Sequence, residues 1–365
     1  MNSHAPDIAV LSDGIRRGHP MRESIVLKFG GGIRIRVKSN STELLIRLRH
    51  YFREFTAEGE EADIGIEAIE MASPDLPLSY IMKEPDPGKT KIKEEYIDLP
   101  DGRIVRKRLT GMVFMFGQGV HIAAGPCLAN DNQVVNFINN RFLEYVLNAN
   151  GLLAHASGVC LGGSGIAIAG FSGTGKSTLS LRLLEDGFDF VSNDRLVLRN
   201  KPNGIKMYGI PKHPRVNPGT LLASNRLMHI ISEEDRSAFG RLTENELWNL
   251  EKKYDVIVHD VFGTGRFRLE SALRGIIVLT WKRTRETTSI RYVDFASRGD
   301  LLDAFMKPVG LFFHAAQGVI PDFSPGKYIG AITGRCPVFE ISGGVDFAHA
   351  ADFIRDYLLR GQAND

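Results

Sequence analysis

The stretch that decides the fold is Gly170-Phe171-Ser172-Gly173-Thr174-Gly175-Lys176-Ser177. It fits the pattern GxxxxGK[ST], in which a glycine-rich loop holds phosphate. The apolar run GIAIA at 165–169 predicts a buried strand before the loop, and STLSLRLLEDG at 177–187 predicts a helix after it. The motif requires this order of strand, loop and helix. The sequence therefore predicts an α/β fold that binds a nucleotide at the start of a helix.

The residue types in this loop indicate how the nucleotide is held. Gly173 and Gly175 allow the backbone to curl, so that several N–H groups point at phosphate oxygens. The start of the following helix adds partial positive charge. We expect Lys176 to reach the β- and γ-phosphates and the Ser177 hydroxyl to hold Mg²⁺. ATP and Mg²⁺ are thus the predicted cofactors, and the predicted nucleotide-binding residues here are Gly170, Ser172, Gly173, Thr174, Gly175, Lys176, Ser177 and Thr178.

Composition limits the class of protein. The chain has 365 residues, which is enough for two domains, and its net charge of +2 gives no reason to expect a nucleic-acid or membrane partner. The cysteines, Cys127, Cys160 and Cys336, are far apart and lack the spacing of a metal site, which favours neutral thiols in a reducing compartment. The first 24 residues contain no apolar core of a secretory signal. We therefore expect a cytoplasmic protein.

The hydrophobic pattern divides the chain into three parts. Residues 1–24 are predicted to be a flexible N-terminus, 25–128 a small α+β domain, and 129–365 the nucleotide-binding domain. Within the small domain, 25–37 is predicted to be a strand, and 72–93, with four prolines, a loop.

The sequence lacks the motifs that are typical of other families of nucleotide-binding proteins. The nearest approach to the base-reading NKxD of GTPases is Asn200-Lys201-Pro202-Asn203, which has no Asp. No LSGGQ-like signature of an ABC-type ATPase appears, and no HRD or DFG of a eukaryotic protein kinase.

The run from Leu153 to Leu198, LAHASGVCLGGSGIAIAGFSGTGKSTLSLRLLEDGFDFVSNDRLVL, resembles the catalytic core of HPr kinase/phosphorylase and the HprK-related kinases. These bacterial serine kinases share their core with phosphoenolpyruvate carboxykinase. The resemblance lies in His155 before the first core strand, the phosphate loop, and the acidic position after a later strand. It implies a P-loop kinase core of this type behind the small N-terminal α+β domain.

The resemblance also implies roles for single residues. In the family a strand ends in Ala-Asp-Asp, where the first Asp is proposed to deprotonate the acceptor serine and the second lies near the metal. This chain has Ser192-Asn193-Asp194 at that place. An amide cannot accept a proton at neutral pH, so Asn193 cannot serve as the base. Asp194 is the expected Mg²⁺ ligand, together with Ser177.

Three interpretations of this departure stay open. Asp194 serves as base as well as metal ligand, or His155 serves as base, since an imidazole with a pKa of about 6.5 suits proton transfer. In the third, the chemistry is weakened and the protein is a nucleotide-dependent regulator. Phosphoryl transfer depends mostly on positioning and charge neutralisation, so loss of one base need not abolish it.

Two more stretches are candidates for the same site. Residues 210–219 place Lys212 and Arg215 in a proline-bounded loop that is predicted to contact phosphate. Residues 259–266 combine Asp260 with flexible glycines and Arg266. Arg266 is a candidate to stabilise the transferring phosphoryl group and Asp260 to contact metal or acceptor, with an ordinary structural turn as the equal alternative.

The predicted catalytic residues are thus His155, Lys176, Asp194 and Arg266. The predicted function is ATP-dependent transfer of a phosphoryl group to a hydroxyl, with a serine or threonine of a protein or peptide as the expected acceptor. A small-molecule hydroxyl kinase and a non-catalytic ATP-binding regulator are the alternatives. Self-association is implied only by the resemblance, because HPr kinases assemble into rings.

Overall fold

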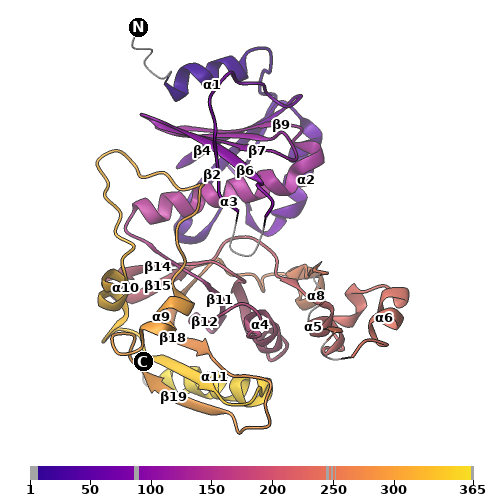
Figure 1. Ribbon diagram of the computed structural model, residues 1–365, viewed down its shortest axis with the longest axis vertical. Coiled ribbons are helices and arrows are strands. Elements are labelled where there is room, and N and C mark those ends of the chain that lie inside the picture. The colour runs from indigo at the N-terminus through magenta and orange to yellow at the C-terminus, as the bar shows by residue number, and fades with distance from the viewer. Residues whose placement is uncertain (1–6, 86–89, 244–245, 248–249, 251, 363–365) are drawn as a thin grey trace. The chain divides into compact units, whose positions relative to one another are not determined.

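The computed structural model describes residues 7–85, 90–243, 246–247, 250 and 252–362. The chain is a mixed α/β protein with two large mixed sheets, each in its own compact unit (Figure 1). Unit 1 comprises Met1–Asn150 and Val309–Pro321, and unit 2 comprises Gly151–Pro308 and Asp322–Asp365. No helix in the described part of the chain has the length and apolar character needed to cross a membrane.

The sheet of unit 1 has the strand order β3-β1-β2-β4-β9-β8-β7-β6-β5. Its pairs are antiparallel except that β4 runs parallel to both β2 and β9. The strands are β1 (Glu23–Lys28), β2 (Arg34–Ser39), β3 (Thr56–Ala57), β4 (Ile64–Glu70), β5 (Ile81–Met82), β6 (Glu94–Leu99), β7 (Gly102–Lys107), β8 (Val113–Gly117) and β9 (Val120–Gly125).

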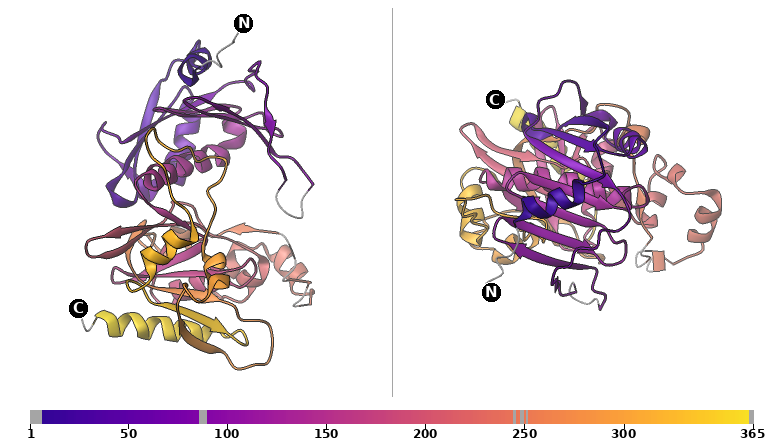
Figure 2. Two further views of the ribbon diagram at one scale, coloured as in Figure 1. Left: turned by 60° about the vertical axis from the view of Figure 1, so that its left-hand side comes forward. Right: turned by 90° about the horizontal axis from the view of Figure 1, so that it is seen from above.

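Helices cover both faces of this sheet (Figure 2). On β8, Val113 and Met115 face the cluster that includes Ile8 of α1 (Ile8–Arg16). Phe114 alternates with them and points the other way, where its ring lies 5.1 Å from Phe137 of α3 (Asp131–Asn148). The second helix on this face is α2 (Thr42–Tyr51), which Ser41 caps by accepting from Leu44 N–H at 3.2 Å.

Two predictions about this region were wrong in detail. The predicted strand at 25–37 is the hairpin β1–β2, because Gly30–Gly32 form a turn in which Gly31 has a φ of 76°. The predicted loop at 72–93 contains β5, which pairs with β6, although residues 86–89 lie outside the described part of the chain.

The unit boundaries also differ from the predicted domain limits. Part of the supposed flexible N-terminus is α1, whose Ile8 and Ile15 are buried and whose first N–H bonds to the Asp101 carboxylate at 3.0 Å. Residues 1–6 lie outside the described part. The boundary falls at Asn150 rather than at 128, because α3 packs on the sheet of unit 1.

The larger sheet of unit 2 has the strand order β10-β14-β15-β18-β12-β11-β13, with β20 paired to β18 and β19 paired to β20. The central strands β12, β18 and β20 run parallel to each other. The strands are β10 (Leu152–Ala154), β11 (Ala156–Leu161), β12 (Ser164–Gly170), β13 (Asp189–Ser192), β14 (Leu196–Lys201), β15 (Gly204–Tyr208), β18 (Glu270–Leu279), β19 (Ser289–Val293) and β20 (Val338–Ser342). A separate small sheet pairs β16 (Arg215–Val216) with β17 (Tyr254–Asp255).

Helices also cover both faces of the larger sheet. Ala167 and Ala169 of β12 join a buried cluster with residues of α9 (Gly299–Phe305) and α10 (Pro325–Ile332). Ile166 points to the opposite face, toward α4 (Lys176–Glu185) and α11 (Phe347–Gln362), which contact each other. Further helices in the described part of unit 2 are α5 (Pro218–Leu222), α6 (Glu233–Phe239) and α8 (Val258–Phe262).

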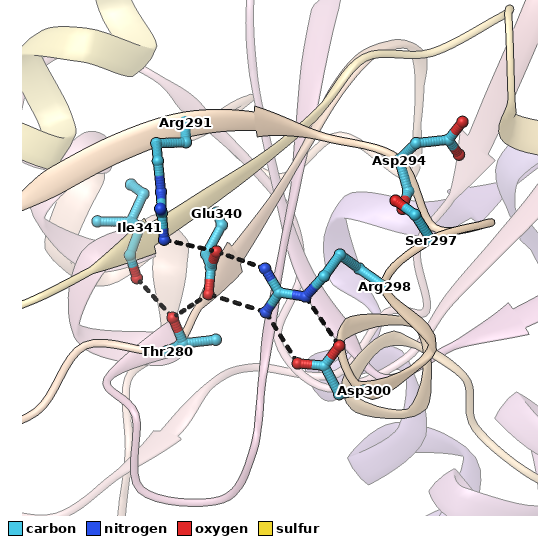
Figure 3. A network of polar contacts seen from close by, with 8 residues as sticks. All are labelled: Thr280, Arg291, Asp294, Ser297, Arg298, Asp300, Glu340 and Ile341. Carbon is cyan, nitrogen blue, oxygen red and sulfur yellow. Dashed lines mark hydrogen bonds and ion pairs between the residues drawn. The ribbon is translucent and has the colours of Figure 1, made fainter.

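A closed ion network stabilises β20 in unit 2 (Figure 3). Glu340 is only 5% exposed and accepts hydrogen bonds from Thr280 at 2.9 Å and from Arg298 at 2.8 Å. Arg298 also binds both carboxylate oxygens of Asp300, and Arg291 approaches Glu340 at 3.4 Å. The hydrogen bonds from Arg298 hold the pKa of Glu340 below its usual value. The positive charges of two arginines are thus matched by the negative charges of two carboxylates, and we interpret the network as structural.

Candidate functional site

The glycine-rich loop joins β12 to α4, as the sequence predicts for this strand and helix. Gly175 has a φ of +91°, and a Cβ at this position would lie 2.8 Å from the ring of Phe347. Gly170 has a φ of +144°, and a Cβ there would lie 2.8 Å from the Leu279 carbonyl oxygen. Both positions therefore require glycine for two reasons, the backbone conformation and the lack of space for a Cβ. At Gly173 a Cβ would meet no atom within 4 Å, so only the backbone φ of +84° favours glycine there.

Aromatic residues support the loop from outside its sequence. The Trp281 indole Nε1 donates to the Thr174 carbonyl oxygen at 2.7 Å. The Trp281 ring meets the Phe347 ring edge-on at 5.1 Å, so α11 and the segment that follows β18 both contact the loop. Ser172 is exposed, Ser177 is half-buried, and the Thr178 hydroxyl hydrogen-bonds with that of Thr220 at 2.9 Å.

Lys176 lies folded over the loop that carries it. Its Nζ donates to the carbonyl oxygens of Gly170 at 2.6 Å and Phe171 at 3.2 Å. Burial lowers the pKa of Lys176 to about 8, with the Lys307 ammonium adding to this effect and the Asp194 carboxylate opposing it. Lys176 thus belongs to the same charge cluster as Asp194 and Lys307.

Asp194 is the centre of this cluster, which we call the Asp194 cluster and which comprises His155, Lys176, Asp194, Arg195, Lys212 and Lys307. Its Oδ1 lies 3.2 Å from His155 Nε2, and its Oδ2 lies 2.9 Å from Lys307 Nζ. Desolvation raises the pKa of Asp194, but the hydrogen bond with His155 and the Lys307 ammonium outweigh it, so the pKa is far below its usual value. The carboxylate is ionised at neutral pH and, at 51% exposed, can still be approached from solvent.

His155 and Lys307 reach Asp194 from adjacent backbones. An antiparallel bridge joins Ala154 to Met306, so His155 and Lys307 each stand one residue beyond the bridged pair. Successive side chains of extended backbone alternate between faces, which puts these two on the same face. The fold therefore brings together residues that are 152 positions apart in the numbering, 155 and 307.

Two members of the Asp194 cluster, Arg195 and Lys307, were not predicted from the sequence, and Lys307 makes the closer contact with Asp194. It stands alone in the run FMKPVG, which fits no phosphate-binding pattern. Its place opposite Leu153 depends on α9 returning the chain to the edge of β10, and no local pattern encodes that return.

Asn193 occupies the turn between β13 and β14. Its Oδ1 is buried and has no hydrogen-bond partner among the described residues. Ser192 Oγ closes the turn by donating to the Arg195 carbonyl oxygen at 2.6 Å. The turn therefore leaves the Asp194 carboxylate exposed, whereas the Asn193 Oδ1 accepts no hydrogen bond from the described residues.

The two cations of the predicted phosphate-contacting loop have different surroundings. Burial, and to a lesser degree Arg195 and Arg215, lower the pKa of Lys212, while Asp194 and Asp255 oppose this, so Lys212 lies within the electrostatic reach of both carboxylates. Arg215 is 52% exposed and pairs with Asp255 at 3.1 Å across the β16–β17 sheet. Lys212 therefore belongs to the Asp194 cluster, and Arg215 holds the small sheet together.

Arg266 makes contacts that differ from its predicted catalytic role. Its guanidinium pairs with Asp189 at 2.8 Å and donates to the carbonyl oxygens of Leu184 and Phe188. These bonds tie the end of α4 to the start of β13, so we leave Arg266 out of the proposed catalytic residues. Asp260 lies 3.4 Å from His259 Nε2.

The residues present fit Mg²⁺ as a partly protein-held ion. Among the described residues there is no group of three or more His, Cys, Asp or Glu side chains that could cage a metal. Mg²⁺ commonly takes only one or two protein oxygens and completes its shell with phosphate and water. The Ser177 hydroxyl and the Asp194 carboxylate are hard oxygen donors of this kind, and both stay predicted ligands.

Comparisons with known proteins give a distant likeness of fold. No protein-family model matches the chain, and no curated protein matches it. Among solved structures, the Hpr(Ser) kinase/phosphatase from Coxiella burnetii is similar with 14% sequence identity and a TM-score of 0.32. The match covers 58% of this chain and 94% of that chain. The function must therefore be inferred from the residues of this chain.

Proposed function

We propose that this chain transfers the γ-phosphoryl group of ATP to a hydroxyl of an acceptor, with a serine or threonine of a protein or peptide as the expected acceptor. The observation that carries the proposal is the Asp194 cluster. Lys307 pairs with the Asp194 carboxylate at 2.9 Å, Arg195 approaches it at 3.9 Å, and Lys176 and Lys212 are close enough for it to raise their pKa values. Cationic side chains beside a glycine-rich turn at a helix N-terminus are what a polyphosphate requires.

Each residue has a role in this proposal. The N–H groups of the loop and Lys176 bind the β- and γ-phosphates, and Ser177 and Asp194 hold Mg²⁺. When bound, Mg²⁺ supplies neutralisation of the charge that develops on the transferring group. Lys176 has to leave the carbonyl oxygens of Gly170 and Phe171 to meet phosphate, at a small cost because those bonds are replaced by charge-assisted ones.

His155 is the better candidate for the base. Asp194 has a pKa far below its usual value, which makes its carboxylate a weak base at neutral pH. The hydrogen bond between His155 Nε2 and Asp194 orients the imidazole, so that Nδ1 is left to receive the proton of the acceptor hydroxyl. Asp194 then positions His155 as well as the metal.

A nucleotide-dependent regulator is the second candidate, and Asn193 favours it. An amide stands where the resembling kinases have the carboxylate that is proposed as their base, and its Oδ1 is buried without a partner among the described residues. A protein of this kind would bind ATP tightly without passing on its phosphate.

Transfer of label from γ-labelled ATP tests the proposal. The wild-type chain, Lys176→Ala, Asn193→Asp and the control Asn200→Asp would each be incubated with Mg²⁺ and a bacterial lysate, and also alone. A labelled species that depends on Lys176 supports a kinase, and a gain with Asn193→Asp but not with Asn200→Asp indicates an impaired one. Tight ATP binding with no transfer by any of the four chains contradicts the kinase and supports the regulator.

A further inference from the structure

We propose that Lys307 is a second phosphate-binding cation, which contacts the terminal phosphate of a bound nucleoside triphosphate. The inference rests on the proposed function and deepens it, because it makes the site selective for nucleoside triphosphates over diphosphates. It is carried by the backbone anchoring of Lys307, by the charge balance around its ammonium and by its position beside the glycine-rich loop.

The backbone holds Lys307 firmly. Its N–H donates to the Leu153 carbonyl oxygen at 3.1 Å, and the N–H of His155 donates to the Phe305 carbonyl oxygen at 2.7 Å. Pro308 follows directly and restricts Lys307 to extended conformations. Lys307 is therefore anchored on the edge of β10 rather than carried on a free loop, and little entropy is lost when its ammonium meets a ligand.

The ammonium of Lys307 uses only part of its hydrogen-bonding capacity on Asp194. Lys307 Nζ makes one ion pair, at 2.9 Å, with a carboxylate that also pairs with His155 and has Arg195 at 3.9 Å. An ammonium has three donors, so a single shared oxygen leaves capacity for an anion. The Lys307 side chain is 24% exposed, which shields it from bulk water without closing it off.

The position of Lys307 fits the end of a phosphate chain. In the β11–β12 register Ala156 lies opposite Ala169, which puts His155 beside Gly170 at the start of the glycine-rich loop. Lys307 lies on the strand bridged to this one, and His155 and Lys307 both contact the carboxylate predicted to hold Mg²⁺. A diphosphate bound in the loop would satisfy Lys176 alone. A third phosphate adds negative charge where Lys307 stands, and two cations would then clamp it.

A purely structural lysine makes different predictions. If Lys307 served only to neutralise Asp194, its loss would change the affinity for ATP and ADP alike, or would lower the stability of the fold. A contact with the terminal phosphate changes the affinity for ATP selectively. The ratio of the two dissociation constants therefore separates the two roles.

The experiment compares Lys307→Met and Lys307→Arg with the wild-type chain and two reference variants. Lys206→Met is the matched control, because Lys206 makes a similar ion pair with Glu270, at 2.7 Å, on β15. Lys176→Ala reports on the loop itself. Dissociation constants for ATP, ADP and AMP would be measured by calorimetry with and without Mg²⁺, and thermal unfolding would verify that each variant folds.

We expect Lys307→Met to weaken ATP binding roughly 10- to 100-fold and ADP binding less than threefold, since one charge-assisted contact to phosphate is lost. Lys307→Arg should restore most of the selectivity for ATP, and Lys206→Met should leave all the constants unchanged.

Equal losses for ATP and ADP, or none, in a folded Lys307→Met chain would overturn the inference. If Lys176→Ala still weakens nucleotide binding in that case, the proposed function survives and only the role of Lys307 fails. A wild-type chain that binds no nucleotide overturns both.

Discussion

Two clusters of charged residues in this molecule use their cations in opposite ways. In unit 1, Arg141 is 1% exposed: it pairs with Glu144 at 2.6 Å, donates to the Phe312 carbonyl oxygen and lies 4.0 Å from the centre of the Phe116 ring, while its Nε has no hydrogen-bond partner among the described residues. Burial lowers its pKa to about 10, and Glu144 opposes this. In unit 2, the carboxylate of Asp194 is half exposed and is contacted by His155 and by Lys307.

The difference separates a cluster that stabilises the fold from one suited to a ligand. A buried charge without a partner is costly, so a stable fold requires buried charges to be matched, as they are at Arg141 and Glu144 and within the Glu340 network. In the Asp194 cluster an exposed carboxylate and several cations lie together beside the glycine-rich loop, and under the proposed function these cations bind phosphate.

The largest expected effect is on the folding of unit 1. Arg141→Met would leave Glu144 buried without its cation, and we expect it to lower the free energy of unfolding by about 3–5 kcal/mol. Urea denaturation followed by circular dichroism would measure this. The control is Arg355→Met, since Arg355 pairs with Asp352 on the surface of α11, and it should leave the midpoint unchanged. A loss no larger than that of the control would show that the Arg141 cluster is not structural.

The next effect is on chemistry in unit 2. Asp194→Asn removes the predicted metal ligand and the acceptor that orients His155, so phosphoryl transfer should fall by roughly 100-fold or more. The Mg²⁺ dependence of ATP binding should be lost as well. Asp300→Asn, which removes a carboxylate from the Glu340 network, should transfer phosphate at the wild-type rate. Equal rates for both variants would contradict the role given to Asp194.

A smaller effect is expected from pH. Phosphate binds the charged form of Lys176, whose pKa of about 8 in the free protein rises when an anion is bound. ATP affinity should therefore be flat below pH 8 and fall by about tenfold per pH unit above it, with uptake of a proton. Calorimetry in buffers of different ionisation enthalpy would detect that proton. Affinity that stays flat to pH 9.5 in the wild-type chain would contradict the lowered pKa.

The smallest effect concerns the support of the loop. Trp281→Phe keeps an aromatic ring against Phe347 but removes the hydrogen bond to the Thr174 carbonyl oxygen, which contributes about 1 kcal/mol. ATP affinity should fall by about fivefold, with the unfolding midpoint nearly unchanged. An unchanged affinity would show that the loop keeps its shape without Trp281.

A feature of the fold or the site could be predicted from the sequence when the residues that determine it are contiguous in the chain. The strand, turn and helix around 165–187 were predicted because one run of residues encodes them, and Gly170 and Gly175 are needed at their positions. The contacts of Arg266 could not be predicted, because the packing of α4 is what brings the carbonyl oxygens of Leu184 and Phe188 near its guanidinium. Lys307 was missed for the same reason, because its contact with Asp194 spans more than a hundred residues.

The most direct test of the central claim is a calorimetric titration of the wild-type chain and Lys176→Ala with ATP in the presence of Mg²⁺. If the cations around Asp194 bind a nucleotide, the wild-type chain should bind one ATP, and Lys176→Ala should bind it at least tenfold more weakly while unfolding at the same temperature. Absence of binding by the wild-type chain, or equal binding by a folded Lys176→Ala chain, would contradict the claim.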